Sequence, residues 1–61
     1  MLKKTLAVRP GQKFLHIRGK TIYIVKSVRN DAVMLISEDG KASMLIQMGD
    51  LIAGGFEPLY D

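Results

Sequence analysis

The chain has 61 residues, with no cysteine and a single histidine, His16. This length fits one small domain, and the lack of cysteine excludes disulfides and thiolate metal sites. One histidine leaves a structural zinc site or a catalytic triad short of its usual side chains. The composition, 48% hydrophobic and 25% charged, is that of a globular protein and excludes a disordered chain.

Charge is divided sharply along the chain. Residues 1–30 contain eight Lys and Arg side chains and no acid, whereas residues 31–61 contain six Asp and Glu side chains and Lys41. The halves therefore have formal charges of +8 and −5, which sum to the +3 of the whole chain. Such a basic half indicates an anionic partner, unless acidic side chains of the same chain or of a second copy lie against it.

Residues 1–4 resemble the start of a signal peptide, but only four apolar or neutral residues follow before Arg9-Pro10. This is shorter than the apolar region that a signal peptide needs. No apolar run approaches the ~20 residues that span a bilayer. We therefore expect a cytoplasmic protein with no membrane partner.

Four dipeptides predict turns. Pro10-Gly11 suits a type II turn, Gly19-Lys20 a type II′ hairpin turn, and Asp39-Gly40 is the strongest hairpin signal. Asn30-Asp31 lies between two apolar runs, and both residues tolerate the left-handed region. Their spacing of 9, 11 and 9 residues is typical of a small sandwich or barrel.

The runs between the turns are short and rich in β-branched residues, which favours strands. The predicted strands cover residues 13–17, 21–28, 32–37, 42–47 and 56–60. Asp50 is predicted to cap one helical turn that Gly54-Gly55 ends, and Pro58 confines the last strand to a sheet edge. The predicted fold is all-β: one domain over residues 1–61, a five-stranded SH3-like barrel built as a meander of hairpins, with one short helical turn before the last strand.

A two-residue loop at Gly19-Lys20 would pair Ile17 with Ile22 and Lys13 with Lys26. Alternation then places Leu15, Ile17, Ile22 and Ile24 on one face, predicted as the core. The other face would present Phe14, His16, Arg18, Tyr23 and Val25. Like charges at Lys13 and Lys26 would cost stability and call for an acidic neighbour, an anionic partner or solvent.

Cations neutralise phosphates and aromatic rings stack on bases, so this second face predicts a nucleic-acid surface. The predicted contact residues are Lys13, Arg18, Lys20, Tyr23, Lys26 and Arg29. Tyr23, together with Phe14, would supply the stacking rings.

The hairpin at Asp39-Gly40 would pair Leu35 with Met44, Met34 with Leu45 and Val33 with Ile46, which makes both of its faces apolar. One small barrel cannot cover both, so Met34, Ile36 and Leu45 are predicted to lie outside it and to mediate self-association as a homodimer. The alternative is that the N-terminal segment and residues 54–60 fold over this face within one chain.

No enzyme motif is present: the sequence lacks GxGxxG, Walker, HExxH and GxSxG patterns. Glu38-Asp39 is interpreted as turn chemistry, and no residue set predicts a catalytic site, a metal, a cofactor or a small-molecule substrate. We therefore expect a non-enzymatic binding module. It would contact nucleic acid or, alternatively, be a self-associating accessory module without a nucleic-acid role.

Residues 11–14, 18–25, 33–35 and 39–40 resemble the small SH3-like barrels attached to nucleic-acid machinery, which implies the same fold. Residues 1–2, 5, 15–17, 21–28 and 30–33 are similar to the carbon storage regulator family, which are intertwined RNA-binding dimers. That family has a basic residue late in its last strand, where this chain has residues 46–49, IQMG, and an arginine where this chain has Leu6-Ala7. No RNA-contact residue of that family therefore carries over to this chain.

Overall fold

A computed structural model describes residues 8–59. The chain forms five strands and one short helix. These elements are β1 (Lys13–His16), β2 (Thr21–Arg29), β3 (Ala32–Ser37), β4 (Ser43–Gln47), α1 (Met48–Ala53) and β5 (Phe56–Leu59). The sequence predicts a last strand that ends at Tyr60, and Tyr60 lies outside the described residues. Residues 1–7 of the N-terminal segment also lie outside them.

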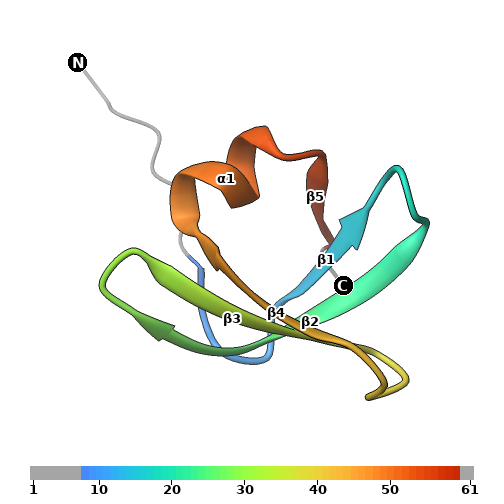
Figure 1. Ribbon diagram of the computed structural model, residues 1–61, viewed down its shortest axis with the longest axis horizontal. Coiled ribbons are helices and arrows are strands. Elements are labelled where there is room, and N and C mark those ends of the chain that lie inside the picture. The colour runs from blue at the N-terminus through green and yellow to red at the C-terminus, as the bar shows by residue number, and fades with distance from the viewer. Residues whose placement is uncertain (1–7, 60–61) are drawn as a thin grey trace.

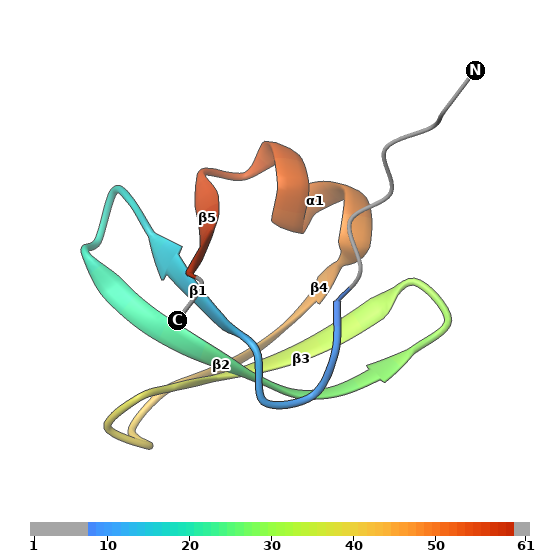
Figure 2. The same ribbon diagram turned by 180° about the vertical axis from the view of Figure 1, so that it is seen from behind.

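All five strands belong to one antiparallel sheet with the order β4-β3-β2-β1-β5. The sheet is strongly curled, and α1 lies across its open side between the last two strands (Figure 1 and Figure 2). β4 and β5 are the two edges, so the sheet is not closed into a barrel. Within residues 8–59, no helix is long and apolar enough to cross a membrane.

Three of the predicted turns are confirmed. The Gln12 N–H donates to the Arg9 carbonyl at 3.1 Å and Gly11 has φ +92°, as a type II turn at Pro10-Gly11 requires. Asn30, with φ +55°, and Asp31 connect β2 to β3 directly. Gly40 has φ +79° in the turn between β3 and β4.

The predicted register of the first hairpin is wrong by two residues. Lys13 lies opposite Ile24, not Lys26, because residues 17–20 form a four-residue loop in place of a two-residue turn. In this loop Lys20 takes the positive φ, +55°, that was expected of Gly19. The predicted repulsion between Lys13 and Lys26 therefore does not exist.

The predicted core face of this hairpin is also wrong. Phe14, Tyr23 and Val25 are buried, whereas Ile17 is 54% exposed and Leu15, Ile22 and Ile24 are half-buried on the outer face. Among the described side chains, the buried hydrophobic residues are Phe14, Tyr23, Val25, Val33, Leu35 and Leu51.

A β-bulge at Lys26 explains this inversion. Val28 lies opposite Val33 near the turn, but Val25 lies opposite Leu35, because one extra residue of β2 is inserted between these pairs. Strand side chains alternate with period two, so one inserted residue exchanges the two faces of everything that precedes it. Tyr23 and Val25 consequently share the inner face with Leu35.

The predicted register of the second hairpin is confirmed: Leu35 pairs with Met44, Met34 with Leu45 and Val33 with Ile46. Met34 and Leu45 lie on the outer face, 37% and 67% exposed, beside half-buried Ile36. The alternative prediction was that the N-terminal segment and residues 54–60 fold over this face. β5, which lies within residues 54–60, instead pairs with the edge of β1.

α1 begins two residues before the predicted cap. Its N-cap is Gln47, which makes no side-chain cap hydrogen bond, and Asp50 lies within the first turn. The Met48 N–H, which a helix N-terminus would leave free, donates to the Asp31 carbonyl at 2.7 Å. Leu51 is fully buried against the inner face of the sheet, so α1 closes the core.

Candidate nucleic-acid interface

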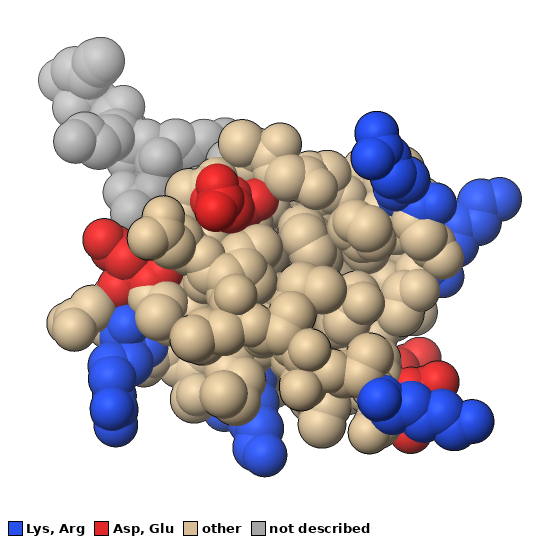
Figure 3. Space-filling model, in the orientation of Figure 1, with Lys and Arg blue, Asp and Glu red and all other residues tan. Residues whose placement is uncertain are grey.

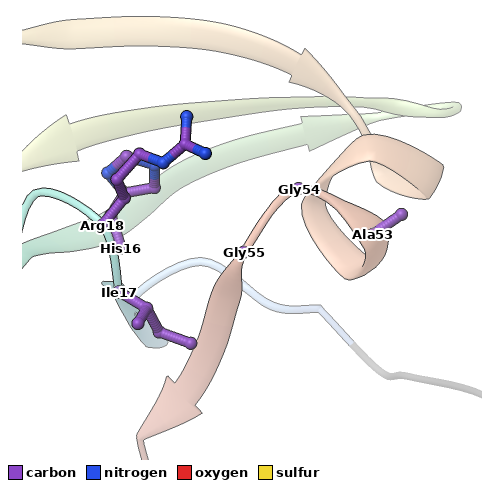
Figure 4. A pocket seen from close by; sticks show the side chains of 6 residues that line it. All are labelled: His16, Ile17, Arg18, Ala53, Gly54 and Gly55. Carbon is purple, nitrogen blue, oxygen red and sulfur yellow. The ribbon is translucent and has the colours of Figure 1, made fainter.

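A groove lies between the β1–β2 loop and the connection from α1 to β5, and we call it the hairpin pocket. It is lined by His16, Ile17, Arg18, Ala53, Gly54 and Gly55 and has a volume of about 580 Å³. His16, Ile17 and Arg18 stand on one side of it and the helix end on the other (Figure 4).

The two sides of the hairpin pocket are tied by backbone contacts. The Ile17 N–H donates to the Gly55 carbonyl at 2.9 Å, across the gap between the loop and the start of β5. Gly55 has φ +86°, a conformation that side chains disfavour. A Cβ at Gly54 would collide with the Asp50 carbonyl oxygen. Both glycines are therefore needed for the chain to turn here from helix to strand.

An aromatic cluster holds His16, one of the residues that line the hairpin pocket. The His16 ring packs on Phe56 with a centroid distance of 4.8 Å and an interplanar angle of 39°. Tyr23 meets both rings nearly edge-on, at 6.4 Å from His16 and 6.0 Å from Phe56. These contacts fix His16 and the loop that follows it.

Arg18 is the cation of this pocket. Its side chain is exposed, no acidic residue lines the pocket, and it makes no ion pair within residues 8–59. A guanidinium offers five N–H donors in a planar fork that fits phosphate oxygens bidentately. The pocket can thus hold a phosphate group against a rigid wall.

Lys13 and Lys20 have acidic neighbours instead. The Lys13 ammonium lies 3.3 Å from a Glu38 carboxylate oxygen, with both side chains about half exposed. Lys20 lines a second, smaller groove together with Glu38 and Asp39. Glu38 therefore pairs with Lys13, although an exposed pair of this kind adds little to stability, and the β3–β4 turn places two carboxylates at the groove that Lys20 lines.

Asp39 is held as a carboxylate in this turn. The Ser37 hydroxyl donates to Asp39 Oδ1 at 2.6 Å, and the Lys41 N–H donates to the same oxygen at 3.0 Å. Both bonds favour the charged form and lower the pKa of Asp39 below its ordinary value of 3.8. The groove that Lys20 lines therefore contains a charged carboxylate at neutral pH.

Lys26 and Arg29 lie toward the other end of β2. Lys26 is the bulge residue, and Arg29 is the last residue of the strand; both are exposed. The path along β2 from Lys20 to Arg29 is nine residues, about 30 Å at 3.3 Å per residue. In the view of Figure 3 the blue Lys and Arg side chains lie at several places around the rim, two of them side by side at the upper right and some beside red Asp and Glu, and the centre is uncharged.

The two predicted stacking rings lie in the core. Tyr23 is 8% exposed and Phe14 is 1% exposed, so neither offers a ring face to a base. The structure brings together Arg18, His16 and the helix end. The six predicted contact residues do not form one surface: Arg18 lines the hairpin pocket, Lys13 and Lys20 lie near the β3–β4 turn, Lys26 and Arg29 lie toward the other end of β2, and Tyr23 is buried. The glycines of the pocket wall were missed as site residues because their proximity to Arg18 depends on the pairing of β1 with β5.

Within the described part of the chain, no three His, Asp or Glu side chains lie close enough together to hold a metal ion. No protein-family model, curated protein or solved structure matches this chain.

Proposed function

We propose that this protein is a non-enzymatic binding module that contacts the phosphate backbone of a nucleic acid, with Arg18 at the hairpin pocket as its principal contact. The observation that carries the proposal is an exposed arginine without an acidic partner in the described residues, at a groove whose two sides are joined by a backbone hydrogen bond and whose His16 packs in an aromatic cluster. Phosphate contacts dominate the affinity of such proteins.

The remaining cations have unequal roles in this proposal. Lys26 and Arg29 form a second, distant contact for the same nucleic-acid strand. In the part of the chain that the structure describes, no ion pair holds either side chain. Lys13 and Lys20 contribute less, because Glu38 and Asp39 lie beside them. Tyr23 has a structural role under His16.

We also propose that the fold is an SH3-like barrel opened between β4 and β5. The strand order brings the last strand beside the first and leaves the helical turn between the fourth and the fifth. This arrangement supports the resemblance to SH3-like barrels that the sequence suggests.

A salt titration of binding to a single-stranded oligonucleotide tests the function. The slope of log K against log[salt] is about −0.7 for each phosphate that is neutralised on a single strand. Arg18→Gln should flatten the slope by about 0.7 and weaken binding. Lys20→Gln should change it less, because Lys20 shares its groove with two acids.

Lys41→Gln is the matched control, since it removes one positive charge outside the hairpin pocket. It keeps the backbone N–H of residue 41, which donates a hydrogen bond to Asp39 Oδ1. An equal effect of Arg18→Gln and Lys41→Gln would show that only net charge matters. Absence of binding to single- and double-stranded DNA and RNA at about 50 mM salt, where electrostatic binding is strong, would reject the proposal.

The second candidate function is self-association without a nucleic-acid role. It is favoured by a different observation, the outer face on which Met34 and Leu45 are exposed.

A further inference from the structure

The two edges of the sheet differ in how they are protected. β5, with the sequence FEPL, carries Glu57 and Pro58, and a proline or a charged residue on an edge strand prevents pairing with another chain. β4, with the sequence SMLIQ, carries neither a charged residue nor a proline. Such an edge is a template for another strand.

The backbone groups on the free side of β4 are those of Ser43 and Leu45 and the N–H of Gln47. The Ser37 N–H donates to the Ala42 carbonyl and the Met48 N–H to the Asp31 carbonyl, so the even-numbered residues of this segment bond toward β3. The backbone N–H and C=O groups of successive residues point to opposite sides of a strand, so those of the odd-numbered residues point away from β3. All three residues are exposed. Gln47 is the N-cap of α1, so its carbonyl accepts the first bond of that helix, whereas no bond from another described element reaches the backbone groups of Ser43 and Leu45 or the Gln47 N–H.

β4 is also complementary to itself. If two copies pair antiparallel about Leu45, Leu45 lies opposite its own counterpart and Ser43 lies opposite Gln47. On the inner face Met44 would lie opposite Ile46, and both are half-buried at the margin of the core. Apolar side chains therefore meet apolar ones, polar meet polar, and no like charges are opposed.

We infer that a second copy of this chain pairs with β4, which would join two five-stranded sheets into one continuous sheet across a two-fold axis. The Leu45 pair would supply two backbone bonds and each of the two Ser43–Gln47 pairs one, about four in all, because the Gln47 carbonyl is used by α1. The Leu45 side chains, each 67% exposed in one chain, would cover each other and extend the apolar surface of Met34. The strand can be followed in Figure 1 from the β3–β4 turn to α1.

The absence of cysteine from the chain makes site-specific crosslinking a direct test. In the paired dimer the two Leu45 Cα atoms would be about 5.5 Å apart, within the range for a disulfide. Leu45→Cys should therefore form a disulfide dimer under mild oxidation. Met34→Cys is the control on the same outer face: three strand spacings, about 14 Å, would separate the two thiols. It should crosslink far more slowly.

Sedimentation equilibrium of the unmodified chain completes the test. The mass should rise toward that of two chains between roughly 10 µM and 1 mM, the range expected of a small interface. Leu45→Lys should abolish this rise, because two lysines would be opposed, while circular dichroism stays unchanged. Equal crosslinking of Leu45→Cys and Met34→Cys would overturn the pairing in favour of face-to-face packing. A mass of one chain throughout would overturn the dimer, and neither result depends on nucleic-acid binding.

Discussion

Replacement of Leu51 by alanine tests whether α1 holds the curled sheet together. Leu51 is fully buried and is the only described residue of α1 in the buried core. Leu→Ala changes at such sites cost about 3–5 kcal/mol, through lost transfer free energy and the cavity that remains. A chain of this length has a total stability of about 3–9 kcal/mol, at 0.05–0.15 kcal/mol per residue. Leu51→Ala should therefore remove at least about a third of the free energy of unfolding, and all of it if the total lies at the lower end of this range.

Urea unfolding followed by circular dichroism measures this loss, with Leu45→Ala as the matched control. Leu45 is 67% exposed, so its truncation should change the free energy of unfolding by no more than about 0.5 kcal/mol. Both variants should be measured at low micromolar concentration, where association of two copies does not contribute. A loss below about 1 kcal/mol for Leu51→Ala would refute the reasoning, because the helix would then not be part of the core.

Two further changes probe the pocket wall and the β3–β4 turn. Gly54→Ala should destabilise the fold, since the new Cβ would meet the Asp50 carbonyl. Gly49→Ala has open space around its Cβ and should be neutral or stabilise α1 by up to about 1 kcal/mol. Thermal unfolding compares the two variants, and equal melting temperatures for Gly54→Ala and Gly49→Ala would contradict this reasoning. Asp39→Asn should lower stability at pH 6, but its difference from the unmodified chain should shrink as pH falls below 3.8. A lowered folded-state pKa contributes stability that is fully present above the unfolded-state pKa and is lost as pH falls through the folded-state pKa. A difference that is constant from pH 6 to pH 2 would exclude the carboxylate as its source.

Local turn chemistry was the most predictable part of the fold. Pro10-Gly11, Asn30-Asp31 and Asp39-Gly40 each form a turn where it was predicted, because proline, asparagine and glycine set backbone dihedral angles without help from distant residues. The second hairpin followed correctly, since its register depends on that short turn. The helix start was less predictable, because the partner of its first N–H, the Asp31 carbonyl, belongs to a distant turn.

Inner and outer faces could not be assigned from alternation alone. The pattern of β2 reads equally well with Ile22 and Ile24 inside or with Tyr23 and Val25 inside, and the bulge at Lys26 selects the second. A single extra residue leaves no mark in the sequence but exchanges the faces. The same inversion moved Tyr23 from the predicted binding surface into the core. It also made aliphatic side chains the outer surface of the sheet.

The charge division of the sequence acquires a narrower meaning in the folded chain. Its acidic half reaches the basic half at the β3–β4 turn, where Glu38 pairs with Lys13 and lies with Asp39 beside Lys20. Arg18 is only two residues from Lys20, but it lines a different groove that contains no acid. The number of basic residues therefore overstates the surface that is free for an anion. Arg18 and Lys20 belong to one loop but face different surroundings. If Arg18 binds phosphate, replacing Arg18 must therefore weaken nucleic-acid binding more than replacing Lys20. If only the overall electrostatic field attracts the nucleic acid, the two replacements must weaken binding equally.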